Sequence, residues 1–324
     1  MKTKISIITV ILVLALLFAV VPAYATTLRL SHITDRDNIW HRASEVFAEE
    51  VEERTDGEVT VEIFPNEQLG SEMETIEGIR TNTIADLTIT GESLGNWASK
   101  IEILGGMYLF EDSEHIKKVA DGPIGEEIEE DMLEKANVRA LTWFERGPRH
   151  LTSNEPIKTA EDAEGMQLRV PNVPWFLEGW EAIGADPSPM DFGEVYSALQ
   201  QGVIDGQENP LALIHSSNFY EVQDYVNLTG HIRQYIYLVI GEDQYQSLTD
   251  DQKEAVQNAA DVAHEFHQEE FVKEEKELRE KLEEEGMEFV EVDVDSFRKA
   301  VEDVVYDEFP EHEEMYEKIR EAAE

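Results

Sequence analysis

Arg169 is the residue of this sequence whose possible chemistry is easiest to define. It lies in a short stretch, Gln167-Leu-Arg-Val170, that Pro171 stops. A guanidinium cannot be neutralised by losing its proton, so leaving it buried and unpaired is costly. Its planar fork matches a carboxylate through two parallel hydrogen bonds. We therefore expect an anionic partner, either a ligand or one of the protein's own acidic side chains.

Two further segments carry polar groups suited to binding. Asn209 lies in Asp205-Gly-Gln-Glu-Asn-Pro210, where glycine and proline indicate a strand that leaves into a loop. It either contacts a ligand or caps that turn. Arg149 lies in Arg146-Gly-Pro-Arg-His150, a local excess of positive charge in an acidic chain. This segment is either a second anion contact or a solvated loop.

Alternating strands and helices must position these residues. Strands are expected at 59–63, 87–89, 138–144, 167–170 and 203–206, and helices at 40–51 and 175–183. Such alternation predicts parallel sheets, whose carboxyl ends are where ligands bind. A much longer helix is predicted from the capping box Thr249-Asp-Asp-Gln252 to Gly286, because no proline or glycine interrupts it. It is either a coiled-coil arm or a helix that joins two domains.

The charge of the chain excludes several partners. The formal net charge is −45, and it becomes −47 without residues 1–25, which hold two lysines and no acid. Nucleic acid and anionic lipid both require basic surfaces. The strongly acidic surface expected for this chain suits high salt, because at roughly 1 M salt the Debye length is about 3 Å and surface carboxylates hardly repel one another. We therefore expect a halophilic protein whose stability rises with NaCl.

The first 25 residues have the pattern of an export signal. Lys2 and Lys4 precede an apolar run, and Ala23-Tyr-Ala25 is a small-x-small cleavage site. The alternative is an uncleaved membrane anchor. The chain has no cysteine, which excludes disulfides and the lipid attachment of a lipoprotein. A periplasmic protein cleaved after Ala25 is expected.

Two other patterns allow different chemistry. Gly91-Glu-Ser93-Leu-Gly95 matches the nucleophile elbow of hydrolases, so a secreted serine esterase is an alternative function. His264 and His267, with Glu269 close behind, are spaced to begin a metal site, but a solvated helix face is the preferred interpretation. We expect no metal, no cofactor and no enzymatic activity.

Five motifs in order resemble the substrate-binding proteins of tripartite ATP-independent periplasmic (TRAP) transporters, the DctP type. They are Pro65-Asn-Glu-Gln-Leu-Gly70, Arg149-His-Leu-Thr-Ser-Asn154, Arg169-Val-Pro171, Gly184-Ala-Asp-Pro-Ser-Pro-Met190 and the run from Ala198 to Pro210. The likeness covers essentially the whole chain after the signal. It implies a type II periplasmic-binding-protein fold, which is an α/β fold of two lobes with a hinge and a long domain-spanning helix.

The resemblance also implies domain boundaries and a function. Lobe I comprises 26–146 plus 235–274, lobe II comprises 147–234 plus 275–324, and a helix at about 250–285 bridges them. A monomer is expected to capture a carboxylate-bearing organic acid and deliver it to the membrane subunits of a sodium-driven TRAP permease. A ligand-capture protein for a membrane sensor is a further alternative.

The same resemblance assigns roles to individual residues. Arg169 binds the substrate carboxylate, Arg149 reaches the same group or a second polar group, and Asn209 contacts the substrate. The remaining expected binding residues are Glu92, which accepts hydrogen bonds from hydroxyls, Asn172 after Pro171, and Phe192 as pocket wall. The sequence departs from the sialic-acid binders at Ser31-His-Ile33 and at Gly95. C4-dicarboxylates, sugar acids, and small keto or hydroxy acids stay open as substrates.

Overall fold

The structure is a computed structural model that describes residues 25–323. Its strands are β1 (Thr26–Ser31), β2 (Val59–Phe64), β3 (Leu87–Thr90), β4 (Val138–Ser153), β5 (Gln167–Val170), β6 (Asp186–Pro189), β7 (Gly206–Pro210), β8 (Tyr225–Gly241) and β9 (Glu288–Val290). They form one sheet in the order β2-β1-β3-β8-β4-β7-β5-β6, with β9 beside β8. The predicted export signal lies outside the described residues, apart from Ala25, and stays a prediction.

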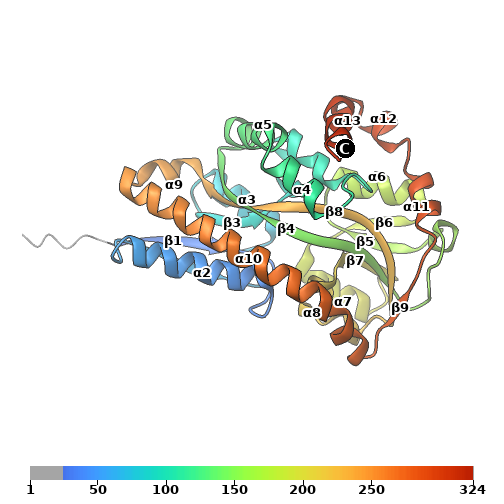
Figure 1. Cartoon of the computed structure of the whole chain (residues 1–324). Helices are drawn as coiled ribbons and strands as arrows, with labels where there is room; N and C mark the ends of the chain where they lie inside the picture. The colour runs from blue at the N-terminus through green and yellow to red at the C-terminus, as the bar shows by residue number, and fades with distance from the viewer. Residues whose placement is uncertain (1–24, 324) are drawn as a thin grey trace, which may run out of the picture.

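Helices cover both faces of this sheet (Figure 1). The α-helices are α2 (Ile39–Arg54), α3 (Glu72–Arg80), α4 (Ser113–Ala120), α5 (Pro123–Asp131), α6 (Pro174–Ile183), α7 (Val195–Gln200), α8 (Leu211–Ser216), α9 (Glu242–Ser247), α10 (Asp250–Glu284), α11 (Val294–Ala300), α12 (Val304–Glu308) and α13 (Glu313–Glu321). None of these helices within 25–323 combines the length and the apolar character needed to cross a membrane.

Strand β8 shows how the two faces are built. Successive side chains of a strand point to opposite faces. Tyr235 and Tyr237 join the core that includes α3 to α6, whereas Ile236 and Leu238 join the core formed with α2 and α10. A strand covered on both faces must be apolar at nearly every position. This explains the continuous buried run at the end of β8.

The sheet is mixed, so the expectation of parallel sheets is only partly correct. β1 pairs in parallel with β2 and β3, and β5 pairs in parallel with β6 and β7. The two long strands β4 and β8 pair antiparallel with each other, β8 also pairs antiparallel with β3, and β4 pairs antiparallel with β7. The chain therefore passes from one parallel group of strands to the other along β4 and returns along β8. Sequence alternation missed this because β4 continues through Gly147 and Pro148.

Apart from the longer β4, most predicted elements occur where expected, with one shift. The strand predicted at 203–206 begins only at Gly206, because Gly202 adopts a positive φ of 66° and the chain turns before entering β7. Val203 is consequently exposed. The strand predicted at 167–170 has the bounds of β5.

Helix α10 forms as predicted and packs along the body of the protein. Thr249 and Gln252 form the expected capping box, and the helix spans 35 residues, about 52 Å at 1.5 Å per residue. Figure 1 shows it running the length of the molecule from α9 toward α8. Its first half packs with α2, and its last half packs with α7 and α8. A projecting coiled-coil arm is therefore excluded for this helix.

Candidate ligand-binding site

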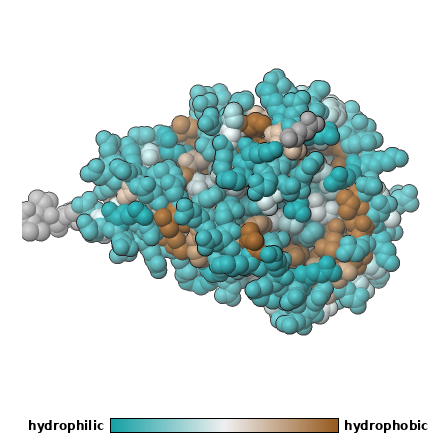
Figure 2. Space-filling model, viewed as in Figure 1, coloured by the Kyte–Doolittle hydropathy of each residue, from teal (hydrophilic) through white to brown (hydrophobic). Residues whose placement is uncertain are grey.

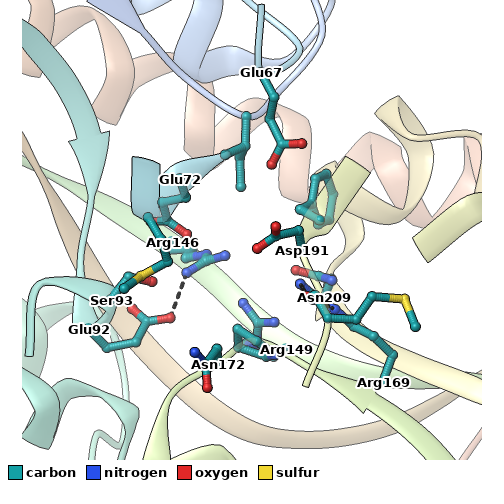
Figure 3. A pocket seen from close by; sticks show the side chains of 15 residues that line it. Glu67, Glu72, Glu92, Ser93, Arg146, Arg149, Arg169, Asn172, Asp191 and Asn209 are labelled. Carbon is teal, nitrogen blue, oxygen red and sulfur yellow. Dashed lines mark hydrogen bonds and ion pairs between the residues drawn. The ribbon is translucent and has the colours of Figure 1, made fainter. Parts of the chain in front are cut away.

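One cavity collects all of the binding residues that the sequence predicted. It contains about 490 Å³ of atom-free space, part of it open to solvent. The predicted residues that line it are Glu92, Arg149, Arg169, Asn172, Phe192 and Asn209. Their roles toward a ligand stay predictions, but their convergence from distant segments is a structural fact (Figure 3).

The cavity lies where the parallel strands of both groups end. Glu67 follows β2, Glu92 follows β3, and Arg169 is the last but one residue of β5. Open α/β sheets bind ligands outside the carboxyl ends of their strands. Each group of strands thus brings its polar residues to the same space.

Arg169 is buried and has no acidic partner. It is 3% exposed, and its Nε and Nη2 donate to the backbone oxygen of Met190 at 3.0 and 2.6 Å. The ring of Phe192 lies 5.7 Å from its guanidinium carbon. No carboxylate among residues 25–323 lies within ion-pair distance of it, which contradicts the alternative of a structural ion pair. Burial lowers the pKa of Arg169 to about 10, because the charge is taken out of water.

Arg149 is held by an acid but keeps one donor free. Its Nε and Nη2 donate to the two carboxylate oxygens of Glu208 at 2.5 and 2.7 Å. His231 lies 3.0 Å from the same carboxylate. Burial would raise the pKa of Glu208, but Arg149 and His231 together lower it to about 2. Nη1 of Arg149 is buried without a hydrogen-bond partner. The solvated-loop alternative is wrong, because residue 149 lies inside strand β4 and is 1% exposed.

Arg146 is a third arginine of the cavity, and sequence analysis did not include it among the binding residues. It forms an ion pair with Glu92 at 3.1 Å, and the other oxygen of Glu92 accepts from Gln234 at 3.0 Å. The ring of Trp40 lies 5.3 Å from its guanidinium carbon. Glu92 therefore orients Arg146. The hydroxyl contact predicted for Glu92 stays a prediction. The cluster of charge in Arg146-Gly-Pro-Arg149 was the available signal.

The amide and aromatic residues occupy different depths. Asn209 is buried in β7 and donates to Gln207 at 2.6 Å, and Gln207 in turn donates to Thr152. This chain of hydrogen bonds fixes the side chain of Asn209. Asn172 is exposed at the rim, and Phe192 is half-buried in the wall.

Three acidic residues that sequence analysis missed line the same cavity: Glu67, Glu72 and Asp191. Burial, together with Asp191 and Glu72, raises the pKa of Glu67 to about 7. Burial and the nearby Glu92 raise the pKa of Glu72, whose carboxylate accepts from Thr90 at 2.6 Å. Glu67 stands inside the motif at 65–70, which was the one available signal for it.

The alternative chemistries find no support at their residues. Ser93 is the second residue of the 3-10 helix Glu92–Asn96, and no histidine lines the cavity among the described residues. His267 is fully buried between Phe144 and Phe271, so the solvated-face interpretation is wrong for it. Helical spacing could have shown this, because His267 continues the buried stripe four residues after Ala263. Within 25–323 no group of three or more potential ligands is arranged to hold a metal.

Comparisons with known proteins agree over most of the chain. The family model DctP, described as bacterial extracellular solute-binding protein, family 7, matches residues 30–312. The solute-binding protein RD1_1052 of Roseobacter denitrificans is 49% identical over 283 residues, 87% of each chain. The sialic acid-binding periplasmic protein SiaP of Vibrio cholerae is 34% identical over 289 residues, 88% of each chain.

Solved structures show the same architecture. A TRAP periplasmic solute-binding protein from Roseobacter denitrificans with bound L-galactonate has 47% identity and a TM-score of 0.89, over 91% of this chain and 98% of that one. Another, from Polaromonas sp. JS666 with bound D-erythronate, has 33% identity and a TM-score of 0.86, over 92% and 97%. The predicted type II periplasmic-binding-protein fold is confirmed.

Proposed function

Because this chain belongs to bacterial extracellular solute-binding protein family 7, the family of TRAP transporter binding proteins, we propose that it captures a sugar acid and delivers it to a sodium-driven TRAP permease. The proposed location is the periplasm, after cleavage behind Ala25. Binding needs no covalent step, and the permease subunits are the proposed partners.

The observation that carries this proposal is the pair of arginines at the cavity. Arg169 has no counter-ion, and Nη1 of Arg149 has no hydrogen-bond partner. A ligand carboxylate would supply acceptors to both and neutralise a buried charge. Once the cavity closes around the ligand and expels water, such charge-assisted bonds are stronger than in water. The other polar groups then fit the hydroxyls of a sugar acid.

Closure of two lobes around the ligand completes the proposed mechanism. The proposed boundaries fall at 146/147 and 234/235, and the β4–β8 register shifts between Arg146 and Arg149. Contacts between the proposed lobes include Glu67 with the backbone N–H of Gly193 at 3.1 Å. A hinge there would let the lobes open and admit the anion. The ligand would favour the closed form only through its better contacts in that form.

The relatives narrow the proposed substrate class. One is described with bound L-galactonate and another with bound D-erythronate, both polyhydroxy carboxylic acids. SiaP is less similar than the L-galactonate protein. The departures from the sialic-acid binders at Ser31-His-Ile33 and Gly95, which the resemblance indicates, also argue against sialic acid. Aldonic and uronic acids are therefore the first compounds to test.

The test is a thermal-shift screen of the purified chain against an organic-acid library at molar NaCl. A true ligand at a hundredfold excess over Kd should stabilise the protein by about 2.7 kcal/mol. We expect sugar acids to raise the melting temperature and neutral sugars of the same length to leave it unchanged. A screen in which no carboxylic acid shifts the transition would refute the proposed function.

A further inference from the structure

We infer that Glu67, Glu72 and Asp191 form an acidic wall that restricts the site to sugar acids with a single carboxylate and rejects the dicarboxylate of the same carbon chain. This inference rests on the proposed function and names the substrate class within it. It also decides between the sugar acids and the C4-dicarboxylates that the sequence left open.

The acidic wall lies across the cavity from the carboxylate-binding arginines. Figure 3 shows Glu67 and Glu72 on one side, Arg149 and Arg169 on the other, and Asp191 between them. Glu67 follows β2 and Glu72 begins α3, whereas Asp191 follows β6. The wall is thus assembled from both proposed lobes when they meet around the ligand.

The acids of this wall form no ion pairs in the described part of the chain. Among residues 25–323, no lysine, arginine or histidine lies within ion-pair distance of Glu67, Glu72 or Asp191. Glu92 differs from them, because Arg146 pairs with it. The one arginine that the structure places on this side of the cavity within 25–323, Arg146, is already paired with Glu92, so a carboxylate at the far end of a ligand would meet the negative charge of the wall without an unpaired cation to receive it. Like charges placed together across a binding interface cost several kcal/mol.

Hydroxyl groups of a ligand, in contrast, can donate hydrogen bonds to the acidic wall. A carboxylate oxygen accepts hydrogen bonds, and Oε1 of Glu67 is a buried acceptor without a partner. Arg149, 1% exposed, likewise keeps an unpartnered Nη1 in the same cavity. One end of the cavity therefore lacks a donor and the other lacks an anion. A chain with one carboxylate and a terminal hydroxyl supplies both.

The rejection of dicarboxylates is a form of specificity by repulsion. Oxidising the terminal CH₂OH of an aldonate to a carboxylate changes little in size and removes the donor that the wall needs. It also adds the charge that the wall repels. Compounds that differ only at this carbon isolate the effect of the acidic wall from every other contact.

The experiment compares two such pairs by titration calorimetry at molar NaCl and pH 8, because burial raises the pKa of Glu67 to about 7 and the wall must be ionised. L-galactonate is paired with galactarate, and D-erythronate is paired with meso-tartrate. At least one aldonate should bind roughly a hundredfold more tightly than its dicarboxylate. The isosteric variants Glu67→Gln and Glu72→Gln, and Asp191→Asn, should narrow that ratio tenfold or more, chiefly by tighter dicarboxylate binding. Glu254→Gln, an exposed charge change on α10, should leave the ratio unchanged.

Each outcome decides the matter. Equal binding of an aldonate and its dicarboxylate by the wild type would overturn the acidic wall and leave the proposed function standing. A wild-type preference that persists in all three variants would also overturn it, because the discrimination would come from elsewhere. Failure of every sugar acid and dicarboxylate to bind would overturn the proposed function itself, and this inference with it. Melting curves of each variant without ligand confirm that it is folded.

Discussion

Arg149 and Glu208 form an ion pair that is almost completely removed from solvent, with side chains that are 1% and 0% exposed. Removing one partner of such a pair leaves an uncompensated charge and costs about 3–5 kcal/mol. We expect Glu208→Gln to lower the free energy of unfolding by that amount, as measured by urea denaturation near pH 7. The lowered pKa of Glu208 agrees, because a carboxyl with a native pKa of about 2 stabilises the folded state above its unfolded pKa of about 4.5.

A surface pair provides the matched control for this variant. Arg139 and Glu242 make two contacts of similar length, 2.6 and 2.8 Å, but their side chains are 30% and 19% exposed. Partly exposed pairs contribute about 1 kcal/mol or less. Glu242→Gln should therefore cost far less than Glu208→Gln. Equal losses in the two variants would show that burial does not determine the strength of the Arg149 pair.

Removing the charge of Arg169 should not destabilise the free protein, unlike breaking the Arg149–Glu208 pair. Arg169→Met keeps the length and packing of the side chain and removes a buried charge that has no counter-ion. We expect ligand binding to fall by roughly two to four decades, from the loss of the partner of a buried carboxylate. The melting temperature of the free protein should stay unchanged or rise. Titration calorimetry and thermal unfolding measure the two effects separately.

The lysine variant separates the charge of Arg169 from its shape. Arg169→Lys keeps the positive charge but lacks the planar fork that receives a carboxylate with two parallel bonds. We expect an affinity between those of the wild type and of Arg169→Met. Full affinity in Arg169→Met would refute the assignment of the substrate carboxylate to this residue.

Local sequence patterns predicted the elements better than the partners of each side chain. The position of Arg169 at a strand end followed from apolar neighbours and Pro171, which act within a few residues. The ion pair of Arg149 depends on Glu208, 59 residues later and on another strand. Glu67 and Asp191 come together only through the packing of distant elements, so apart from the motif at 65–70 nothing local to either residue indicated the acidic wall.

The path of β4 shows a different limit. Gly147 and Pro148 predict a loop, and the strand was expected to end at Phe144. In the structure β4 continues to Ser153, because Pro148 falls where the β4–β8 register shifts and no ladder hydrogen bond is required of it. Tertiary pairing with β7 and β8 thus overrides the local signal. The long helix α10 had no such conflict, and its start and end were predicted within one or two residues.

Salt should stabilise this protein strongly. The chain carries 71 acidic and 26 basic residues, and Figure 2 shows a surface that is mostly hydrophilic. Raising NaCl from roughly 0.1 to 1 M shortens the Debye length from about 10 to about 3 Å and screens repulsion among surface carboxylates. We expect the urea midpoint to rise through this range. A sucrose series at matched water activity distinguishes screening from solute exclusion, and a flat NaCl curve would contradict the halophilic interpretation.

His267 should make the protein sensitive to acid. The ring is stacked 4.6 Å from that of Phe144, neither nitrogen has a partner, and burial lowers its pKa to about 3. Below about pH 6.5 the histidine is protonated in the unfolded chain but stays neutral in the folded chain. The free energy of unfolding therefore decreases as the pH falls below 6.5. Between pH 8 and pH 5 the loss is about 2 kcal/mol. We expect His267→Leu to remove it, measured as a smaller decline in the free energy of unfolding.

The wild type and His267→Leu should differ in how steeply the free energy of unfolding changes with pH, and this difference reports His267 alone. Four carboxyls whose pKa burial raises to about 7 act in the opposite direction, stabilising the folded state as the pH falls toward 4.5: Glu67, Glu102, Glu129 and Glu275. They are common to the wild type and to His267→Leu, so their effect cancels in the difference between the two curves. At pH 8 the imidazole is neutral in both states, and the two proteins then differ only in packing. Curves that run parallel from pH 8 to pH 5 would mean that the folded protein opens this site to water and protonates His267 there.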